Sequence, residues 1–377
     1  MDSHILYQNP PCTVFLIDIP RSIELVQGLP DSALCRIISS QPPSSPFPNV
    51  EPKSKQACMR FRSKTLRDIV REKQLELALA ELRQRHRREW LLERITEKKA
   101  NEITSDKERH DTSQECNLIL RKIKSGNFDL KCFNPDDEIN YTFYQNTQPA
   151  AVHISYHDTT FYIPPNSTFL LGLIDKTIET FSKKAPKFSI ITIDPPWPNR
   201  SARRKGKYNI ANDTQEIRSL LLSIPITPHL TDNGLVAIWI TNKPSFRTLT
   251  YELFDQWGLR VIEEWIWIKI TTSGEPIFPI LSLWRKPYEV LLIGRKFTAV
   301  DNSNFDMKRR ILVGVPDWHS RKPHIKSLLE KTFQLNNGTY AGLEIFARNL
   351  TINWWSWGDE VLMFQDEQQW VEVIANP

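Results

Sequence analysis

From about residue 161 onward, short apolar runs alternate with helix-like stretches, and this alternation constrains the fold more than any other feature of the chain. Short apolar runs bounded by turn residues are typical of buried strands. Strands that alternate with helices favour an α/β fold with a mostly parallel sheet, in which ligands bind beyond the carboxyl ends of the strands. The expected strands cover residues 188–193, 235–240, 261–268, 289–293, 343–346 and 361–364, and the expected helices cover 214–222, 244–257 and 322–333.

The preceding part of the chain differs in composition. A strand-like run at 14–17 is followed by residues 41–48, which are rich in proline and serine and predict a linker. Residues 60–99 contain neither glycine nor proline and favour one long helix, whose broken apolar stripe predicts packing along part of its length. The expected organisation is an N-terminal segment at 1–50, a basic helical region at 51–155 and an α/β domain at 156–377.

Basic charge is concentrated in two places. The formal net charge is only +5, but residues 53–99 carry fifteen Lys and Arg against seven Asp and Glu. The second cluster lies between residues 200 and 207 and is followed by a tyrosine; it consists of Arg200, Arg203, Arg204, Lys205 and Lys207, with Tyr208 next. Such charge indicates a polyanionic partner with phosphate groups, although a solvated loop and a solvated helix face are the alternatives.

The five cysteines are scattered through the first 132 residues without a C-x-x-C pair, which argues against a disulfide framework and a structural zinc site. The amino terminus lacks the basic and apolar regions of a secretory signal. The apolar runs are too short to cross a bilayer. We therefore expect an intracellular, soluble protein that needs no metal.

The tetrapeptide Asp194-Pro195-Pro196-Trp197 directly follows the expected strand at 188–193, which places it at the carboxyl edge of the sheet. These residues suit a reaction at the exocyclic amine of adenine. That amine is a poor nucleophile, because its lone pair is delocalised into the ring. A carboxylate and a backbone carbonyl can accept hydrogen bonds from its two N–H groups. The prolines stiffen the backbone that carries these acceptors, and Trp197 offers a surface on which a base can stack. The alternative is a structural turn with Trp197 packed in the core.

Several other chemistries lack their motifs. The chain has 12 glycines but no G-x-G-x-x-G, and it lacks G-x-x-x-x-G-K-[ST] and G-x-S-x-G. These absences argue against a dinucleotide site, a P-loop and an α/β-hydrolase site. The histidines show no metal-binding spacing, and His319 is interpreted as a structural residue.

Further blocks extend the tetrapeptide into a longer pattern, at 161–167, 194–197, 239–242, 267–270, 273–275, 286–289, 319–323, 343–350 and 357–360. With these blocks the chain resembles the D-P-P-W adenine-N6 methyltransferases, the family that includes the eukaryotic messenger-RNA adenosine methyltransferase. Within that family it looks most like the branch called methyltransferase-like protein four. The resemblance covers roughly residues 160–367.

The resemblance implies a class I (Rossmann-like) S-adenosylmethionine-dependent methyltransferase fold with a permuted motif order, in which the catalytic strand precedes the strand that carries cofactor contacts. Asp194, Pro195, Pro196 and Trp197 would hold the target adenine. The implied cofactor contacts are Asp194 at the methionine amine, Lys286 at the carboxylate, Arg348 and Asn349 at the ribose, and Asp359, Glu360, Asn166 and Ser167 at the base. Asp359 departs from the family pattern, because a carboxylate cannot supply the donors of an amide.

The same resemblance implies an RNA substrate, notably a 2′-O-methylated internal adenosine of a spliceosomal small nuclear RNA. A DNA adenine methyltransferase and a non-catalytic RNA-binding scaffold subunit are the alternatives. We expect a monomer in the nucleus, in which the loop at 200–207 closes over nucleic acid and the basic helix contacts the RNA backbone. The arginine-rich stretch 83–88 would also suit nuclear import.

Overall fold

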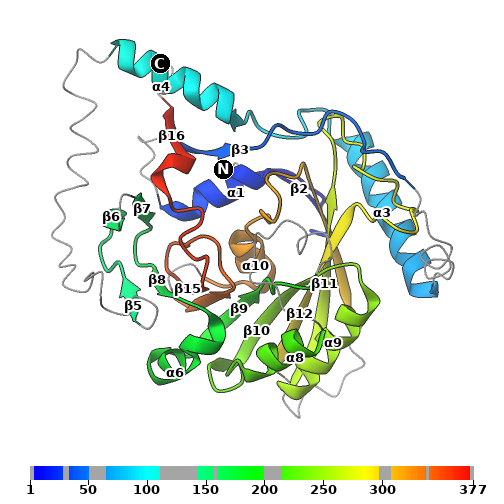
Figure 1. Cartoon of the computed structure of the whole chain (residues 1–377). Coiled ribbons are helices and arrows are strands. Elements are labelled where there is room, and N and C mark those ends of the chain that lie inside the picture. Colours follow the sequence, from blue (N-terminus) through cyan, green and yellow to red (C-terminus); the bar gives the residue numbers. More distant parts are fainter. Residues whose placement is uncertain are drawn as a thin grey trace.

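The computed structural model describes residues 4–28, 34–50, 65–110, 142–156, 159–198, 214–296, 307–336 and 339–373. Within these residues an eleven-stranded sheet forms the centre, with helices on both faces (Figure 1). The expected α/β class is therefore confirmed. In spatial order the strands are β1 (Ile5–Gln8), β2 (Val14–Ile17), β13 (Lys308–Gly314), β11 (Leu259–Lys269), β12 (Tyr288–Lys296), β10 (Leu230–Ile240), β9 (Phe188–Ile193), β14 (Gly342–Ile345), β15 (Trp354–Gly358), β8 (Thr168–Leu171) and β5 (Phe143–Gln145).

The middle of this sheet is parallel, from β8 through β15, β14 and β9 to β10. Strand β12 is antiparallel to its neighbours β10 and β11. The chain passes through β8, β9 and β10 before it reaches β14 and β15, which lie on the other side of β9. This order confirms the expected permutation. It also makes the end of β9 the point where connections leave toward both sides of the sheet, which is where open α/β sheets bind ligands.

Alternation along the strands separates two apolar layers. In β9, Ile191 and Ile193 face a layer covered by α6 (Ile174–Lys184), α8 (Thr214–Ser223), α9 (Pro244–Gln256) and α3 (Leu66–Arg85). Ile190 faces the opposite layer, which is covered by α1 (Ile19–Glu24) and α10 (Lys326–Phe333). Burial on both faces explains why the central strands are almost continuously apolar in sequence.

The N-terminal region is built into the same sheet. Strand β2 pairs in parallel with β13, and β1 pairs with β2. Helix α3 is fastened by an ionic cluster around the buried Glu264 of β11, which lies 3.5 Å from Arg71, 2.7 Å from Arg247 and 2.7 Å from Arg309. Although burial alone would raise it, these three guanidinium groups hold the pKa of Glu264 below its usual value.

Two basic residues of the region 51–155, Arg71 and Arg94, therefore stabilise the fold. Arg71 pairs with Glu264, and Arg94, also buried, donates to backbone carbonyls of Val315, Pro316 and Ser40. Neither side chain is exposed for RNA. The exposed Arg87 and Arg88 remain available for the predicted backbone contact.

The expected helix at 60–99 is wrong as a single element. Helix α3 ends at Arg85, an irregular segment follows, and the chain continues through β4 (Ile95–Thr96) into α4 (Glu97–His110); residues 60–64 lie outside the described residues. The break occurs where Trp90 and Leu91 pack against the apolar layer that α3, α6, α8 and α9 cover. There the Leu92 amide also donates to the Asp18 carboxylate. Tertiary contacts here override helix propensity.

Two other expectations need correction. Residues 361–364 form turns and not a strand; Val361 and Phe364 are apolar because they are buried from those turns. The helix expected at 322–333 begins only at Lys326. Pro323 disfavours a helical conformation at Lys322, the first residue of the expected range. Residues 319–325 are thereby left as a loop at the carboxyl edge of the sheet.

Two small sheets complete the fold. One contains β16 (Trp370–Val373), β3 (Leu34–Ser39) and β4, and the other pairs β6 (Val152–Tyr156) with β7 (Thr159–Ile163). Two 3-10 turns cover Leu25–Gln27 and Glu367–Gln369. None of the helices in the described ranges is long and apolar enough to cross a membrane.

Candidate active site

Asp194 is the first residue after β9 and lies between two cavities. The larger one has a volume of about 930 Å³ and extends from Asp194 over β10 and β12. The smaller one, of about 40 Å³, extends from Asp194 over β14, where Glu344 and Asn349 line it. A further small cavity of about 80 Å³ continues from Arg348 to Asp359 and Glu360. One carboxylate therefore faces two compartments, as a site that joins two reactants requires.

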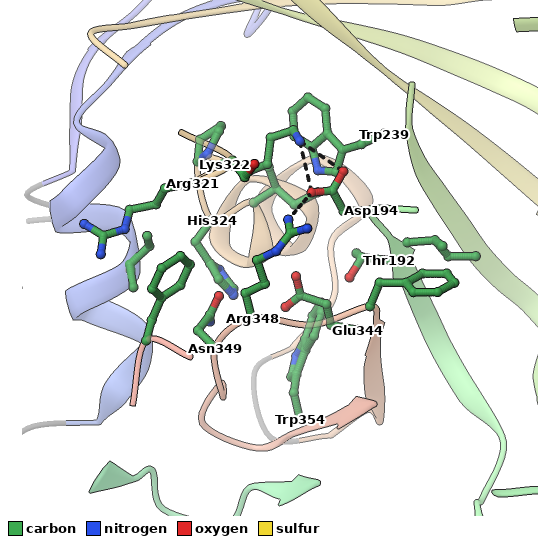
Figure 2. Close-up of a pocket in the computed structure, with 17 residues that line it drawn as sticks. Thr192, Asp194, Trp239, Arg321, Lys322, His324, Glu344, Arg348, Asn349 and Trp354 are labelled. Atoms are coloured by element: carbon green, nitrogen blue, oxygen red, sulfur yellow. Dashed lines mark hydrogen bonds and ion pairs between the residues drawn. The ribbon is translucent and has the colours of Figure 1, made fainter. Parts of the chain in front are cut away.

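The Asp194 carboxylate is held by two cations (Figure 2). The Nζ atom of Lys322 lies 3.0 Å from both carboxylate oxygens, and Nη1 of Arg348 lies 3.2 Å from Oδ2. Each cation has a second anionic partner, Glu289 at 3.2 Å from Lys322 and Glu360 at 2.8 Å from Arg348. Alternating charges of this kind fix side-chain positions at the edge of the sheet.

The pKa values reflect this alternation. Burial alone would lower the pKa of Lys322, but Asp194 and Glu289 raise it above its ordinary value. For Glu289, burial is outweighed by Lys269 and Lys322, which lower its pKa to about 2. Both groups therefore stay charged at neutral pH.

Glu344 behaves in the opposite way. It lies on β14 in the small cavity, next to Asp194 and Arg348 (Figure 2). Burial, and then the negative charge of Asp194, raise its pKa to about 8. A carboxyl group that holds its proton near neutral pH can donate a hydrogen bond as well as accept one.

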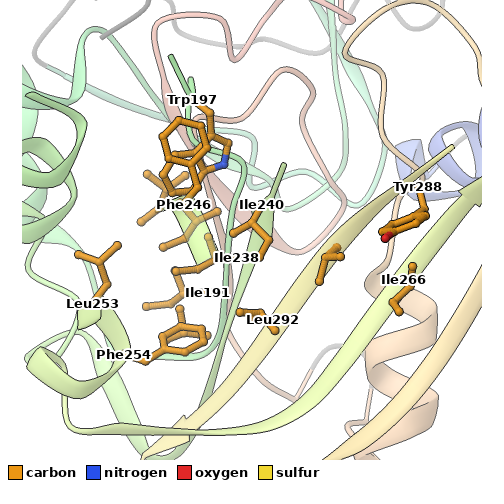
Figure 3. Packing of buried hydrophobic residues seen from close by; sticks show 14 of the residues in the cluster. Ile191, Trp197, Ile238, Ile240, Phe246, Leu253, Phe254, Ile266, Tyr288 and Leu292 are labelled. Carbon is orange, nitrogen blue, oxygen red and sulfur yellow. The ribbon is translucent and has the colours of Figure 1, made fainter. Parts of the chain in front are cut away.

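The aromatic member of the tetrapeptide is packed, not open. Trp197 is only 7% exposed, its ring stacks on Phe246 at 4.7 Å, and its indole N–H donates to the Trp239 carbonyl at 2.7 Å (Figure 3). Phe246 covers one face of the Trp197 ring, and Trp197 also lines the large cavity, so stacking of the target base on this ring stays a prediction. Trp197 ties the tetrapeptide to α9 and to β10.

The prolines shape the turn between the cavities. The Trp197 amide donates to the Pro195 carbonyl at 2.7 Å, which closes a tight turn directly after Asp194. Pro195 lines the large cavity, and Pro196 lines both the large cavity and the one that contains Asp359. The expected stiff backbone between two ligand compartments is thus in place.

Several predicted cofactor residues meet at the small cavities. Arg348 contacts Asp194 directly, and the buried Asn349 lines the same cavity, donating to the Leu350 carbonyl at 3.2 Å. Asp359 and Glu360 line the neighbouring cavity with Leu173, Ile174 and Asp175. The start of α6 at residues 173–175, just beyond the carboxyl end of β8, is not among the predicted site residues. The place of β8 in the parallel sheet, two strands from β14, is the signal that marks it.

Two predicted contacts lie elsewhere. Lys286 lines the large cavity, but its ammonium group pairs with Glu72 of α3 and not with Asp194. Lys322, which the sequence pattern contained only within the block at 319–323, is the lysine beside Asp194.

Asn166 and Ser167 lie just before β8, toward the amino edge of the sheet. Thr168 is level with Trp355 of β15, and Trp355 is level with Leu343 of β14. The structure does not bring them to Asp194.

The predicted nucleic-acid loop, with Arg200, Arg203, Arg204, Lys205, Lys207 and Tyr208, lies outside the described residues. Its assigned role stays a prediction.

Comparisons with known proteins match the part of the chain that contains this site. The MT-A70 family model matches residues 188–360, which include β9, Asp194 and the strands on both sides of it. The N6-methyladenosine RNA methyltransferase MTA1 of Cryphonectria parasitica is 37% identical over 98% of this chain and 94% of its own length. The human N(6)-adenine-specific methyltransferase METTL4 is 37% identical over 61% of this chain and 49% of its own. The Caenorhabditis elegans DNA N6-methyl methyltransferase is 34% identical over 58% of this chain and 57% of its own.

Proposed function

Because the chain belongs to the MT-A70 family and is an N6-adenine methyltransferase of class I fold, we propose that it transfers a methyl group from S-adenosylmethionine to N6 of an adenosine in RNA. The observation that carries the proposal is the position of Asp194 between two cavities of different size. Paired charges around the smaller one complement the charged groups of a zwitterion, and the larger one has room for a nucleotide.

The residues around the small cavities fit the chemical groups of S-adenosylmethionine. The cofactor carries an ammonium and a carboxylate on its methionine part, for which Asp194 and Lys322 have the complementary charges. Its ribose diol needs a group that can accept and donate, as Glu344 and Asn349 can. The cavity at Leu173, Asp359 and Glu360 would hold the adenine ring. When bound, the cofactor supplies a methyl group on a sulfonium that is already an activated leaving group.

The chain's own part in the reaction is to hold the target amine. A carboxylate has about four acceptor positions, and Lys322 and Arg348 use three of those on Asp194. One position remains free, and any contact that Lys322 exchanges for the cofactor carboxylate frees another. Asp194 can then accept from the cofactor ammonium and from one N–H of the adenine amine, and a backbone carbonyl of the proline turn can accept the other N–H. These fixed acceptors stabilise the positive charge that develops on nitrogen during attack. No strong base is required, because the proton leaves after the new bond has formed.

The choice of RNA rests on the fungal relative, which matches almost the whole chain and is named as an RNA methyltransferase. Within RNA, we propose a 2′-O-methylated internal adenosine of a small nuclear RNA as the favoured target, and we propose that the protein acts in the nucleus. DNA adenine is the second candidate, supported by the nematode relative.

Transfer from labelled S-adenosylmethionine tests the proposal directly. Purified protein is incubated with RNA and DNA oligonucleotides of matched sequence, each with adenosine or 2′-O-methyladenosine in the RNA series, and the digested nucleosides are identified by mass spectrometry. N6-methyladenosine from RNA, and more of it from the 2′-O-methylated target, is expected. Transfer to DNA alone would replace the substrate by the second candidate. No transfer together with no cofactor binding would leave a scaffold subunit.

A further inference from the structure

Residues 40–48, which we call the strap, cross the large cavity instead of linking two distant regions. At one end the Ser40 amide donates to Asp317 at 2.7 Å, and Arg94 donates to the carbonyls of Ser40 and Pro316 at 3.3 and 2.9 Å. In the middle of the strap the Pro43 carbonyl accepts from the Thr272 amide, and near its other end the Phe47 amide donates to the Ile277 carbonyl, both at 2.9 Å. The strap is therefore fixed between the β13–α10 loop and the β11–β12 loop.

The strap lines the same cavity as Asp194. Four of its nine residues are prolines, which have no N–H group and hold an extended backbone. At those positions the wall presents ring carbons and carbonyl oxygens. Because such a surface has no N–H donor at these positions, it can lie against a nucleoside without forming hydrogen bonds to the acceptor atoms of its base.

Two exposed aromatic rings stand at the rim of this cavity. Phe47, on the strap, is 47% exposed, and Trp318, on the β13–α10 loop, is 42% exposed. Among the described residues, Phe47 and Trp318 are the exposed large aromatic side chains. Both line the cavity that all four residues of the tetrapeptide also line. By contrast Trp197, Trp239 and Trp267, which line its interior, are at most 7% exposed. Exposed aromatic rings gathered at one cavity mark a binding surface.

The Phe47 ring and the backbone that carries Trp318 are held in place. Phe47 packs at 5.7 Å against Phe278. The backbone beside Trp318 is fixed by Asp317, which accepts from the Ser40 amide and from the guanidinium of the buried Arg321 at 2.6 Å. Stacking surfaces that are already positioned lose little conformational entropy when a ligand binds.

We propose that the strap and Trp318 form the wall that binds an unpaired nucleic-acid strand, with Phe47 and Trp318 stacking on nucleotides that flank the target adenosine. The proposal rests on the proposed function, which puts the target base at Asp194. A cavity of about 930 Å³ lies at the upper end of the range for single small-molecule sites, roughly 300–1,000 Å³, and so has room beyond one nucleoside. Stacking on protein rings requires base faces that are not already stacked in a duplex, and it tolerates any base.

The test uses the full chain with the variants Phe47→Ala, Trp318→Ala and the double variant, and with Phe47→Tyr and Trp318→Phe as conservative replacements. Leu77→Ala, on the exposed face of α3 and 58% exposed, is the matched control. The substrate is a short RNA with one adenosine flanked by 2-aminopurine, either single-stranded or annealed to its complement. We measure methyl transfer, RNA affinity by fluorescence anisotropy, 2-aminopurine emission and the Kd for S-adenosylmethionine.

Each alanine variant is expected to raise KM and the Kd for single-stranded RNA about tenfold, the loss of roughly one stacking contact, while kcat and the cofactor Kd stay within about twofold. The quenching of 2-aminopurine on binding is lost in the alanine variants and kept in the conservative ones. The unpaired strand binds better than the duplex, and this preference shrinks in the double variant. Leu77→Ala changes none of these values.

Unchanged RNA affinity and unchanged quenching in the double variant would overturn the proposal, even where methyl transfer occurs normally. An equal loss of cofactor affinity would also overturn it, since it would show that the strap supports the fold of the site. If the wild type binds RNA with quenching but transfers no methyl group, the proposed function fails while the stacking wall stands. These outcomes separate the two proposals.

Discussion

The cavities on the two sides of Asp194 share several charged side chains but differ in size and in the segments that form their walls. On the β14 side the cavities are small, about 40 and 80 Å³, and acidic and basic side chains pair across them. On the β10 side the cavity is about 930 Å³, with prolines, tryptophans and the strap in its wall. Paired charges held in fixed positions suit the charged groups of a zwitterion. A wide cavity suits one residue of a polymer, whose flanking nucleotides must extend outward.

The comparison predicts first that the largest effect comes from removing the Asp194 carboxylate, because both cavities share it. Asp194→Asn keeps the shape but loses the charge that balances Lys322 and Arg348 and that accepts the amine. Methyl transfer should fall at least about 100-fold, the size of effect seen when one positioned group that stabilises developing charge is removed. The measurement is single-turnover transfer to RNA.

Asp232→Asn is the control for this experiment, because its side chain is 87% exposed on β10 and pairs only with Lys296 in the described structure. Retained single-turnover activity in Asp194→Asn would contradict the role given to the carboxylate.

The second prediction separates the two lysines. Lys322→Met should weaken S-adenosylmethionine binding roughly 30-fold or more, since removing one partner of a buried charge pair costs about 2 kcal/mol or more. Lys286→Met removes an ammonium group that pairs with Glu72 of α3 and not with Asp194, and it should leave cofactor affinity within about threefold. Isothermal titration of the cofactor measures both. The reverse ranking would restore the role that the sequence pattern gave to Lys286.

The third prediction concerns the pH dependence of stability on the β14 side. Because the pKa of Glu344 is raised to about 8, the folded state holds this proton more tightly than the unfolded state does. The contribution of this group is fully present below its unfolded pKa and is lost as the pH rises toward 8.

Between pH 5 and 8.5 the wild type should therefore lose about 2 kcal/mol or more of unfolding free energy relative to Glu344→Gln, which cannot ionise. Urea unfolding of both proteins at several pH values measures the difference. Parallel curves would show that Glu344 is ionised at neutral pH.

The smallest expected effect concerns the packed tryptophan. Trp197→Phe removes the hydrogen bond to the Trp239 carbonyl and should cost about 1 kcal/mol of stability. Transfer activity should stay within about threefold, because phenylalanine keeps an aromatic ring against Phe246. Thermal unfolding and transfer assays measure these two effects.

Trp257→Phe is the control, since the indole N–H of this equally buried residue has no hydrogen-bond partner among the described residues. A large loss of activity in Trp197→Phe with unchanged stability would show that the indole ring contacts the substrate directly.

Local patterns predicted well those elements whose sequence is dictated by burial. The strands around β9 were found because they are buried on both faces and so are apolar at successive positions. Residues 361–364 show the limit of that signal, since buried turns are apolar as well. Helix propensity predicted α3 and α4 as one helix, because it carries no information about the tertiary contacts of Trp90 and Leu91.

The sequence by itself determined the chemistry of this protein. The order of strand, carboxylate and prolines is a local arrangement, and residues adjacent in the chain must be adjacent in space. Only the tertiary structure decided which distant residues join them. Lys322 and Arg348 are separated from Asp194 by more than a hundred residues, and the strap reaches the same cavity from the opposite end of the chain. Such contacts depend on the order of strands in the sheet and on their register, which no local pattern records.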